Sequence, residues 1–223
     1  MQFIPEFLSD ITESVVTIYR GHADCSWELK PSIGRHYTGD EWLNVINWEI
    51  KSLNEFKKQS LPHLKITPKS DIECLCLMQH HGCATRLLDF TSNPLIALFF
   101  ASDPNIRADG EVISAKYGRT YENVSDDKLF NRTHDFAYFP PHITDRIVNQ
   151  SGCFVFSRKP NAQLGGKRIE RIKVPKDNKK GIRSELAQLG ISYSSLFPGI
   201  DGVCQDLNDD LVLDLEFSSM MDT

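Results

Sequence analysis

The sequence lacks the long apolar segments that direct proteins into membranes. Its longest uninterrupted apolar run, Leu95 to Ala101, has seven residues, whereas a membrane-spanning helix needs about 20. The first residues also lack the apolar stretch of a secretory signal peptide. We therefore expect a cytoplasmic protein without a membrane partner.

A cysteine framework is also absent. The six cysteines are scattered along the chain, which is typical of reduced thiols. Cys74, Cys76, His80, His81 and Cys83 lie within ten residues, but a Cys-x-Cys pair in a helix points its thiols about 200° apart. Cys83 near two histidines could act as a nucleophile, yet no third group to orient them is evident. We expect neither disulfides nor a metal site.

An excess of positive charge is missing too, since the net charge is -5. This disfavours a protein that coats nucleic acid with its whole surface. The charge is nevertheless uneven along the chain. Residues 157–183 hold ten Lys or Arg and two acids, whereas residues 199–223 hold seven acids and no base. Within the basic segment, Ile169, Ile172 and Val174 favour a half-buried strand with a solvated charged face over a nucleic-acid track.

Hydrophobic periodicity predicts an α+β fold in a single domain, residues 1–223, with a mixed, twisted sheet flanked by helices. Pro94 opens a nearly all-apolar helix, for which Ser92 or Asn93 is the cap. Residues 118–143 form a long insertion, and the chain ends in a helix. The expected strands are 14–19, 85–91, 111–117, 153–157 and 169–174, and the other expected helices are 40–60 and 70–82.

Glu49 interrupts an apolar stripe formed by Trp42, Ile46, Leu53 and Phe56. A buried carboxylate is costly unless it is paired. We therefore expect Glu49 to meet a cation or to contribute to a cleft.

Cations and short hydroxyl side chains gather where two predicted strands end. Arg20 follows one strand. Arg86, Asp89 and Thr91 lie in another, and Ser92 follows it. Next to a helix N-terminus, such groups make a phosphate or pyrophosphate site. Local capping is the alternative for Asp89, Thr91 and Ser92. It is the simpler interpretation for each of these three taken singly.

His80 and His81 end the helix that precedes this segment, where the helix dipole favours a cation. They are candidates to orient a ligand or to act as general acid and base.

These motifs resemble the FRG domain, a family named after a Phe/Tyr-Arg-Gly signature, here Tyr19-Arg20-Gly21. The resemblance extends to Trp27-x-Leu-x-Pro-Ser32, to His80-His81-Gly82 with Thr85 to Thr91, to Asn93-Pro94, to Gln150 to Phe154 and to Leu196-Phe197-Pro198. It implies a bacterial or phage-borne protein associated with toxin-antitoxin or anti-phage genes.

A weaker resemblance connects the chain with ADP-ribosyltransferases of the Arg-Ser-Glu type. In that pattern Arg20 would hold a phosphate or ribose of NAD, and Thr91 or Ser92 would order the nicotinamide side. The third element has Gln150 where the pattern has a catalytic glutamate. Either another acid serves, with Glu49 and Asp89 ahead of Glu185, or the pocket binds its ligand without catalysis.

The resemblance implies a toxin-like transferase that uses NAD as substrate, with Glu49 or Asp89 as the acid and His80 or His81 as the polar orienter. Its partners would be a nucleotide-like small molecule and a macromolecular acceptor or antitoxin. Two alternatives stay open. One is a nuclease or phosphodiesterase that uses the same arginines and histidines. The other is a recognition module that senses a nucleotide or a phage component without catalysis.

Overall fold

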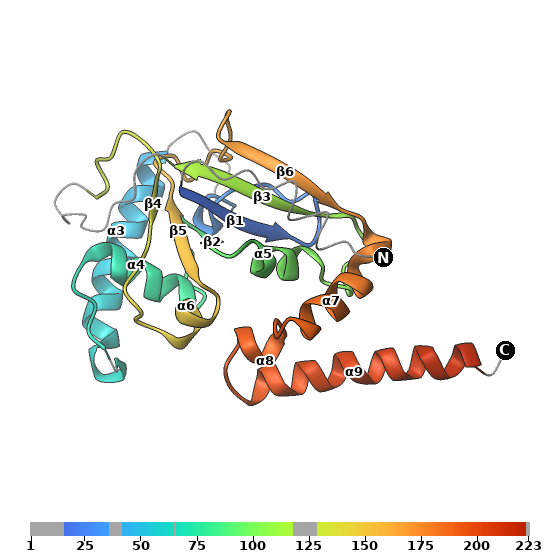
Figure 1. Cartoon of the computed structure of the whole chain (residues 1–223). Helices are drawn as coiled ribbons and strands as arrows, with labels where there is room; N and C mark the ends of the chain where they lie inside the picture. The colour runs from blue at the N-terminus through green and yellow to red at the C-terminus, as the bar shows by residue number, and fades with distance from the viewer. Residues whose placement is uncertain (1–15, 36–41, 65, 118–128, 222–223) are drawn as a thin grey trace.

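The computed structural model describes residues 16–35, 42–64, 66–117 and 129–221. Its elements confirm the predicted α+β class (Figure 1). The strands are β1 (Val16–His22), β2 (Leu87–Thr91), β3 (Gly110–Tyr117), β4 (Phe136–Tyr138), β5 (Gly152–Phe156) and β6 (Ile169–Val174). The helices are α2 (Ser32–Arg35), α3 (Trp42–Ser60), α4 (Asp71–His80), α5 (Pro94–Ala101), α6 (Asp145–Asn149), α7 (Lys179–Gln188), α8 (Tyr193–Leu196) and α9 (Ile200–Met221), with 3₁₀ turns η1 (Leu61–His63) and η3 (Lys176–Asn178).

The strands form one sheet in the order β4-β5-β2-β1-β3-β6. Every neighbouring pair in it is antiparallel, whereas the sequence predicted a mixed sheet. The difference arises between β1 and β2. The helices in this connection return the chain to the end of the sheet at which β1 finished, so β2 runs in the opposite direction.

The sheet is split between its two central strands. β1 pairs with β3 along the whole length of β1, from Val16 to His22. It pairs with β2 only where Tyr19 lies opposite Thr91. Beyond that point the backbone groups of the two strands are no longer paired with each other. This split creates room for side chains between the strands.

Helix α5 packs directly against β1 and holds the exit of that strand in place. Asn93 caps the helix, since its Oδ1 accepts a hydrogen bond from the Leu95 N–H at 2.9 Å, and Pro94 occupies the first turn as predicted. Gly21 permits the close approach. A Cβ at that position would lie 2.0 Å from the Ala97 carbonyl oxygen. The glycine of the Tyr19-Arg20-Gly21 signature is therefore needed for the contact between α5 and β1.

Helix α4 also begins and ends as the sequence predicts. The Ser70 hydroxyl accepts from the Glu73 N–H, and Gly82 follows the helix with a positive φ of 85°. In α3, Ile46 and Leu53 are buried. Asp40, at which the predicted helix 40–60 begins, and the side chain of Trp42 lie outside the described residues.

Further details of the secondary structure differ from the predictions. Strand β1 continues past the predicted end at Tyr19 and includes Arg20 and His22. Strand β4 lies within the segment predicted to be an insertion, of which residues 118–128 are not described. Its three residues are too few to produce a recognisable alternation.

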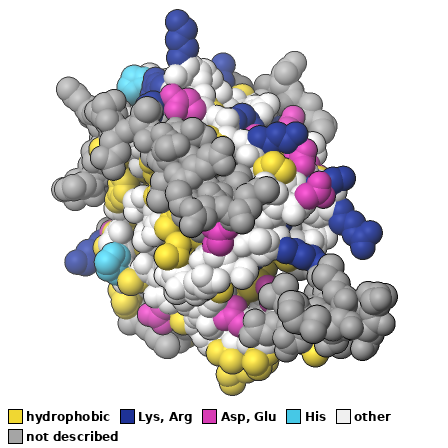
Figure 2. All heavy atoms as spheres, turned by 45° about the vertical axis from the view of Figure 1, so that its right-hand side comes forward, with side chains coloured by type: hydrophobic (Ala, Val, Ile, Leu, Met, Phe, Trp, Pro, Cys, Tyr) yellow, Lys and Arg dark blue, Asp and Glu magenta, His cyan; other side chains and the backbone are white. Residues whose placement is uncertain are grey.

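The basic segment carries a strand with a charged outer face, as predicted. Glu170, Arg171 and Lys173 on β6 are exposed. Two basic side chains of the segment form ion pairs, Arg171 with Glu111 on β3 and Lys173 with Asp109 just before β3. Glu170 of the segment pairs with Lys116 on β3. On the face drawn in Figure 2, basic and acidic side chains are likewise interspersed.

Helix α9 extends away from the sheet and rests on α8 (Figure 1). Asp206 joins the two helices by accepting hydrogen bonds from the backbone N–H groups of Tyr193 and Ser194. Among the described residues, no helix is long and apolar enough to cross a membrane.

Candidate functional site

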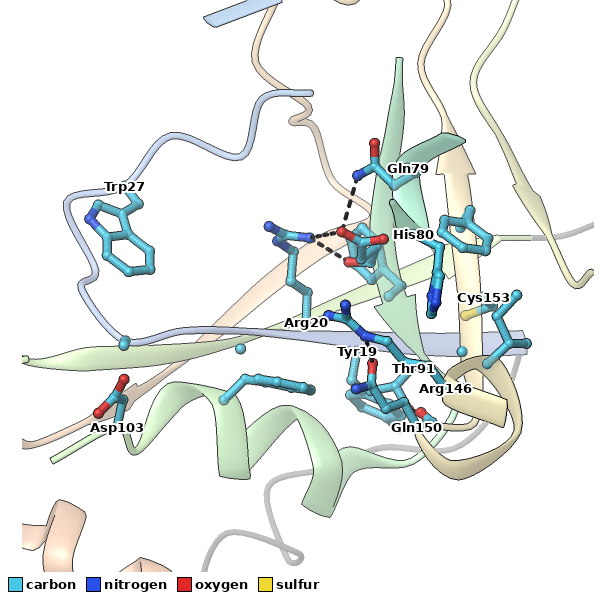
Figure 3. A pocket seen from close by; sticks show the side chains of 18 residues that line it. Tyr19, Arg20, Trp27, Gln79, His80, Thr91, Asp103, Arg146, Gln150 and Cys153 are labelled. Carbon is cyan, nitrogen blue, oxygen red and sulfur yellow. Dashed lines mark hydrogen bonds and ion pairs between the residues drawn. The ribbon is translucent and has the colours of Figure 1, made fainter. Parts of the chain in front are cut away.

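A cavity of about 340 Å³ lies at the split between β1 and β2. Its walls come from the ends of β1, β2 and α4 and from α6, the start of β5 and α5, as Figure 3 shows. The lining residues are Tyr19, Arg20, Gly21, Ala23, Trp27, Gln79, His80, Asp89, Phe90, Thr91, Phe100, Asp103, Arg146, Ile147, Gln150, Gly152, Cys153 and Phe154.

Arg20 extends from β1 into the split. Its Nη1 donates to the Asp89 carbonyl at 2.6 Å, and its Nε donates to His22 Nε2 at 3.0 Å. The guanidinium thus binds a backbone oxygen of β2 at a point where β1 has no ladder pair with that strand. Burial lowers the pKa of Arg20 and the nearby Asp89 opposes this change, but an arginine stays charged in either case. Arg20 supplies a fixed positive charge to the cavity.

Asp89 places a carboxylate beside this charge. Its Oδ2 lies 3.9 Å from Arg20 Nη1, and its side chain is 59% exposed. Gln79 Nε2 donates a hydrogen bond to the same oxygen at 3.1 Å. Both the backbone and the side chain of Asp89 therefore help to orient the wall of the cavity.

Only one of the two predicted histidines lines the cavity. The His80 ring faces it, whereas His81 is exposed outside the lining, and the two rings meet edge to face at 4.9 Å. Burial lowers the pKa of His80, as do His81 and Arg146, while Asp89 acts in the opposite direction. His80 is therefore an uncharged imidazole at neutral pH.

Gln150, the residue at the position of the expected glutamate, lines the opposite wall. Its Nε2 donates to the Leu196 carbonyl at 3.1 Å, and its Oε1 accepts from Arg146 Nε at 3.3 Å. The Arg146 guanidinium also lies 5.0 Å from the ring centre of Phe197. Gln150 thereby holds a second cation at the cavity and links it to α8.

The two hydroxyl residues at the end of β2 bind backbone groups. Thr91 Oγ1 donates to the Gln150 carbonyl at 2.7 Å and accepts from the Asn93 N–H at 3.0 Å. Ser92 Oγ donates to the Ser151 carbonyl at 3.3 Å. Thr91 lines the cavity, but Ser92 does not. The contact of Thr91 with the Asn93 N–H is local, but Asn93 and not Ser92 caps α5.

Glu49 and Arg86 do not line the cavity, which corrects two of the predicted site residues. Their side chains are 0% and 1% exposed and form an ion pair. Both carboxylate oxygens of Glu49 are used, one by Arg86 Nε and the other by the Arg86 backbone N–H at 2.8 Å. The guanidinium lies between the rings of Phe130 and Phe156, 4.8 and 4.9 Å from their centres.

The cause of this correction is the packing of α3. The helix buries the face that carries Glu49, and the predicted cation partner is Arg86, which lies just before β2. Burial raises the pKa of Glu49, and the contacts with Arg86 oppose that rise. The remaining candidate acid, Glu185 on α7, does not line the cavity either. Of the candidate acids, Asp89 alone lies at the cavity.

Sequence reasoning did not select several lining residues. Arg146 belongs to a five-residue helix that the sequence did not predict. Trp27 is 47% exposed at the rim, and its place in the Trp-x-Leu-x-Pro-Ser segment was a signal that could have identified it. Gln79 was also overlooked, although it precedes the histidine pair directly.

The arrangement combines two guanidinium groups (Arg20 and Arg146), two carboxylates (Asp89 and Asp103), an uncharged imidazole and several aromatic rings. Guanidinium groups suit phosphate oxygens, and aromatic faces suit a planar base. Within the described part of the chain, no group of three or more His, Cys, Asp or Glu side chains could hold a metal ion. The lining therefore offers groups that can contact phosphate oxygens and a planar ring.

Comparison with known families identifies residues 16–109 as an FRG domain. The matched segment runs from β1 to the residue before β3 and contains Arg20, Gln79, His80 and Asp89. Arg146 and Gln150 come from the chain beyond it. No curated protein and no solved structure matches the sequence.

Proposed function

We propose that this chain, which carries an FRG domain at residues 16–109, binds NAD and transfers its ADP-ribose to a macromolecular acceptor. In this proposal the protein acts as a toxin-like or defence-associated enzyme. An antitoxin is a further partner. The coarser part of the proposal is that the cavity binds a nucleotide-like ligand.

The observation that carries the proposal is the order of three strands. β5, β2 and β1 are neighbours in the sheet, and Gly152, Thr91 and Tyr19 are in register across them. Each strand brings one element of the ADP-ribosyltransferase pattern. These elements are Arg20 on β1, Thr91 at the end of β2 and Gln150 just before β5, and all three line one cavity.

The cavity has the size and charge for part of such a ligand. Its volume of about 340 Å³ is within the range of small-molecule sites. In the proposal, Arg20 and Arg146 bind the pyrophosphate, and Trp27 at the rim packs against a planar ring.

Asp89 takes the role of the missing glutamate. In the reaction, the bond between ribose C1′ and the nicotinamide nitrogen breaks, and nicotinamide leaves with the bonding electron pair. The acceptor nucleophile forms the new bond to C1′ and loses its proton. The Asp89 carboxylate would stabilise the positive charge that develops on the ribose. His80, uncharged at neutral pH, would accept the proton from the acceptor.

The test is release of nicotinamide from NAD in the presence of bacterial protein and RNA acceptors. Asp89→Asn should lower the rate by about 10²-fold or more, because it removes the charge that stabilises the transition state. Asp177→Asn, an exposed acid outside the cavity, is the matched control. A wild-type rate in Asp89→Asn would refute the assigned role, and no turnover of NAD with any acceptor would refute the transferase.

One observation favours a second function. An uncharged His80 near Arg146 in the same cavity could serve as the base in cleavage of a phosphodiester. Hydrolysis of RNA without NAD, lost in His80→Ala, would select this nuclease function. Ligand binding without turnover of either substrate would instead select a recognition module.

A further inference from the structure

A buried histidine lies directly behind the cavity arginine. His22 is two residues after Arg20 on β1, so both side chains emerge from the same face of the strand. Its side chain is 2% exposed, and it does not line the cavity. Arg20 Nε donates a hydrogen bond to His22 Nε2 at 3.0 Å. His22 thus contacts the ligand-binding cation without access to the ligand.

This hydrogen bond determines which ring nitrogen carries the proton. An N–H donor needs a lone pair to receive it, so Nε2 is unprotonated and the proton of the neutral ring lies on Nδ1. Nδ1 faces the Glu111 carboxylate at 3.3 Å. Glu111 lies opposite His22 on β3, and it also accepts from Arg171 Nη1 of β6. Nδ1 forms no hydrogen bond among the described residues, so the link from Arg20 through His22 to β3 and β6 is a close approach of polar groups at this point and not an unbroken series of hydrogen bonds.

The surroundings keep the ring uncharged. Burial is the main cause that lowers the pKa of His22, followed by the positive charges of Arg20, Arg171 and Arg35, while a hydrogen bond with the Trp27 backbone opposes them. Together they lower this pKa to about 3. The Glu111 carboxylate is the acid that faces the ring. At neutral pH the acceptor nitrogen is therefore available to Arg20.

We propose that His22 is a positioning residue, whose neutral imidazole holds the Arg20 guanidinium between Asp89 and the cavity in the orientation that receives an anionic ligand. This inference rests on the proposed role of Arg20 in ligand binding. With Nε held by His22 and Nη1 held by the Asp89 carbonyl, the guanidinium plane is set by two contacts on separate strands. Without the hydrogen bond from Nε to His22, only the hydrogen bond from Nη1 to the Asp89 carbonyl would hold the guanidinium, and the Arg20 side chain would rotate about it.

His22 supports the rim of the cavity as well. Its ring meets the Trp27 ring edge to face, with 6.0 Å between their centres. His22 therefore orients both Arg20 and Trp27, the cation and the aromatic ring that contact the ligand in the proposed function. An aliphatic or phenyl side chain could fill the same space but could not accept the hydrogen bond.

The first experiment needs no ligand. In ¹⁵N-labelled protein, NMR should show one histidine with an unprotonated Nε2 that does not titrate between about pH 5 and 8. His22→Gln removes that histidine signal and assigns it. In His22→Phe the Arg20 Nε–H signal should move and exchange faster with water. Titration of His22 near its ordinary value, or an unchanged Arg20 signal in His22→Phe, would overturn the inference whether or not NAD binds.

The second experiment measures affinity for ADP-ribose by calorimetry. His22→Phe should weaken binding about tenfold or more, as for loss of a hydrogen bond to a charged group, whereas His22→Gln should retain most of it because its amide oxygen can accept from Arg20. The double variant Arg20→Ala/His22→Phe should bind no worse than Arg20→Ala alone. His142→Phe, at an exposed position, is the matched control.

The two experiments separate the inference from the proposed function. Wild-type protein that shows the NMR signature but binds no ADP-ribose would refute the proposed ligand and support the arrangement of His22 and Arg20. Wild-type protein that binds ADP-ribose with undiminished affinity in His22→Phe would refute the positioning role and support the proposed function.

Discussion

Replacing Glu49 by glutamine should destabilise the protein rather than impair chemistry alone. The Glu49 and Arg86 side chains are 0% and 1% exposed, so the neutral amide would leave the guanidinium buried without its counter-charge. Removing one partner of a buried ion pair costs about 3–5 kcal/mol. The amide retains one oxygen that can accept from Arg86, and we therefore expect the lower part of this range.

The assay is equilibrium unfolding in urea, monitored by circular dichroism. Glu55→Gln is the matched control, because Glu55 lies on the same helix, is exposed and pairs only with nearby residues of α3. Its free energy of unfolding should change by less than about 1 kcal/mol. The double variant Glu49→Leu/Arg86→Met should cost much less than the two single replacements combined, because no charge stays buried.

A Glu49→Gln protein with the wild-type free energy of unfolding would refute this reasoning. If that protein also lost turnover of NAD, Glu49 would return as a candidate catalytic acid. If Glu49→Gln is destabilised but active at low temperature, the residue is structural.

Three further perturbations test other parts of the account. Gly21→Ala should lower the melting temperature markedly, because the new Cβ would lie 2.0 Å from the Ala97 carbonyl oxygen, whereas Gly181→Ala has nothing within 4 Å and should be neutral or slightly stabilising. Lys179→Met should lower both the stability and the affinity for ADP-ribose, because Lys179 Nζ donates to the carbonyls of Ala23, Asp103 and Ile106, and Ala23 and Asp103 line the cavity. Lys176→Met, at an exposed position, is the control. Equal melting temperatures of Lys179→Met and the wild type would contradict this role. Because burial and neighbouring arginines lower the pKa of His22 from 6.5 to about 3, the unfolded chain binds more protons between these values and stability should fall as the pH drops from 6.5. At pH 5 this amounts to about 2 kcal/mol, and urea unfolding of His22→Gln at pH 5 and 7 should show a smaller loss than the wild type; an equal loss would contradict the lowered pKa.

Local signals predicted the parts of the fold that depend on neighbouring residues. Ser70 and Asn93 cap their helices because a short polar side chain can reach the first free N–H groups of the next turn. The antiparallel direction of β2 could not be obtained in this way. It depends on how the helices between β1 and β2 pack, and no short window of sequence contains that information.

The same limit separates Arg20 from Arg86 in the candidate site. Both arginines lie near a strand end, and their local sequences predicted a phosphate-binding role for each. Arg86 is buried because Glu49, 37 residues earlier, reaches it from α3. Arg20 meets the cavity because β2 diverges from β1 after a single pair. These outcomes depend on long-range contacts, as does the presence of Arg146 at the cavity.

The most direct test of the central claim is calorimetric titration of the wild-type protein and of Arg20→Ala with ADP-ribose. Arg107→Ala, which replaces an exposed arginine outside the cavity lining, serves as the control. The account predicts saturable binding by the wild type and by Arg107→Ala, and loss of binding in an Arg20→Ala protein that is still folded at the temperature of the titration. Binding that survives in Arg20→Ala, or no binding by the wild type, would contradict it.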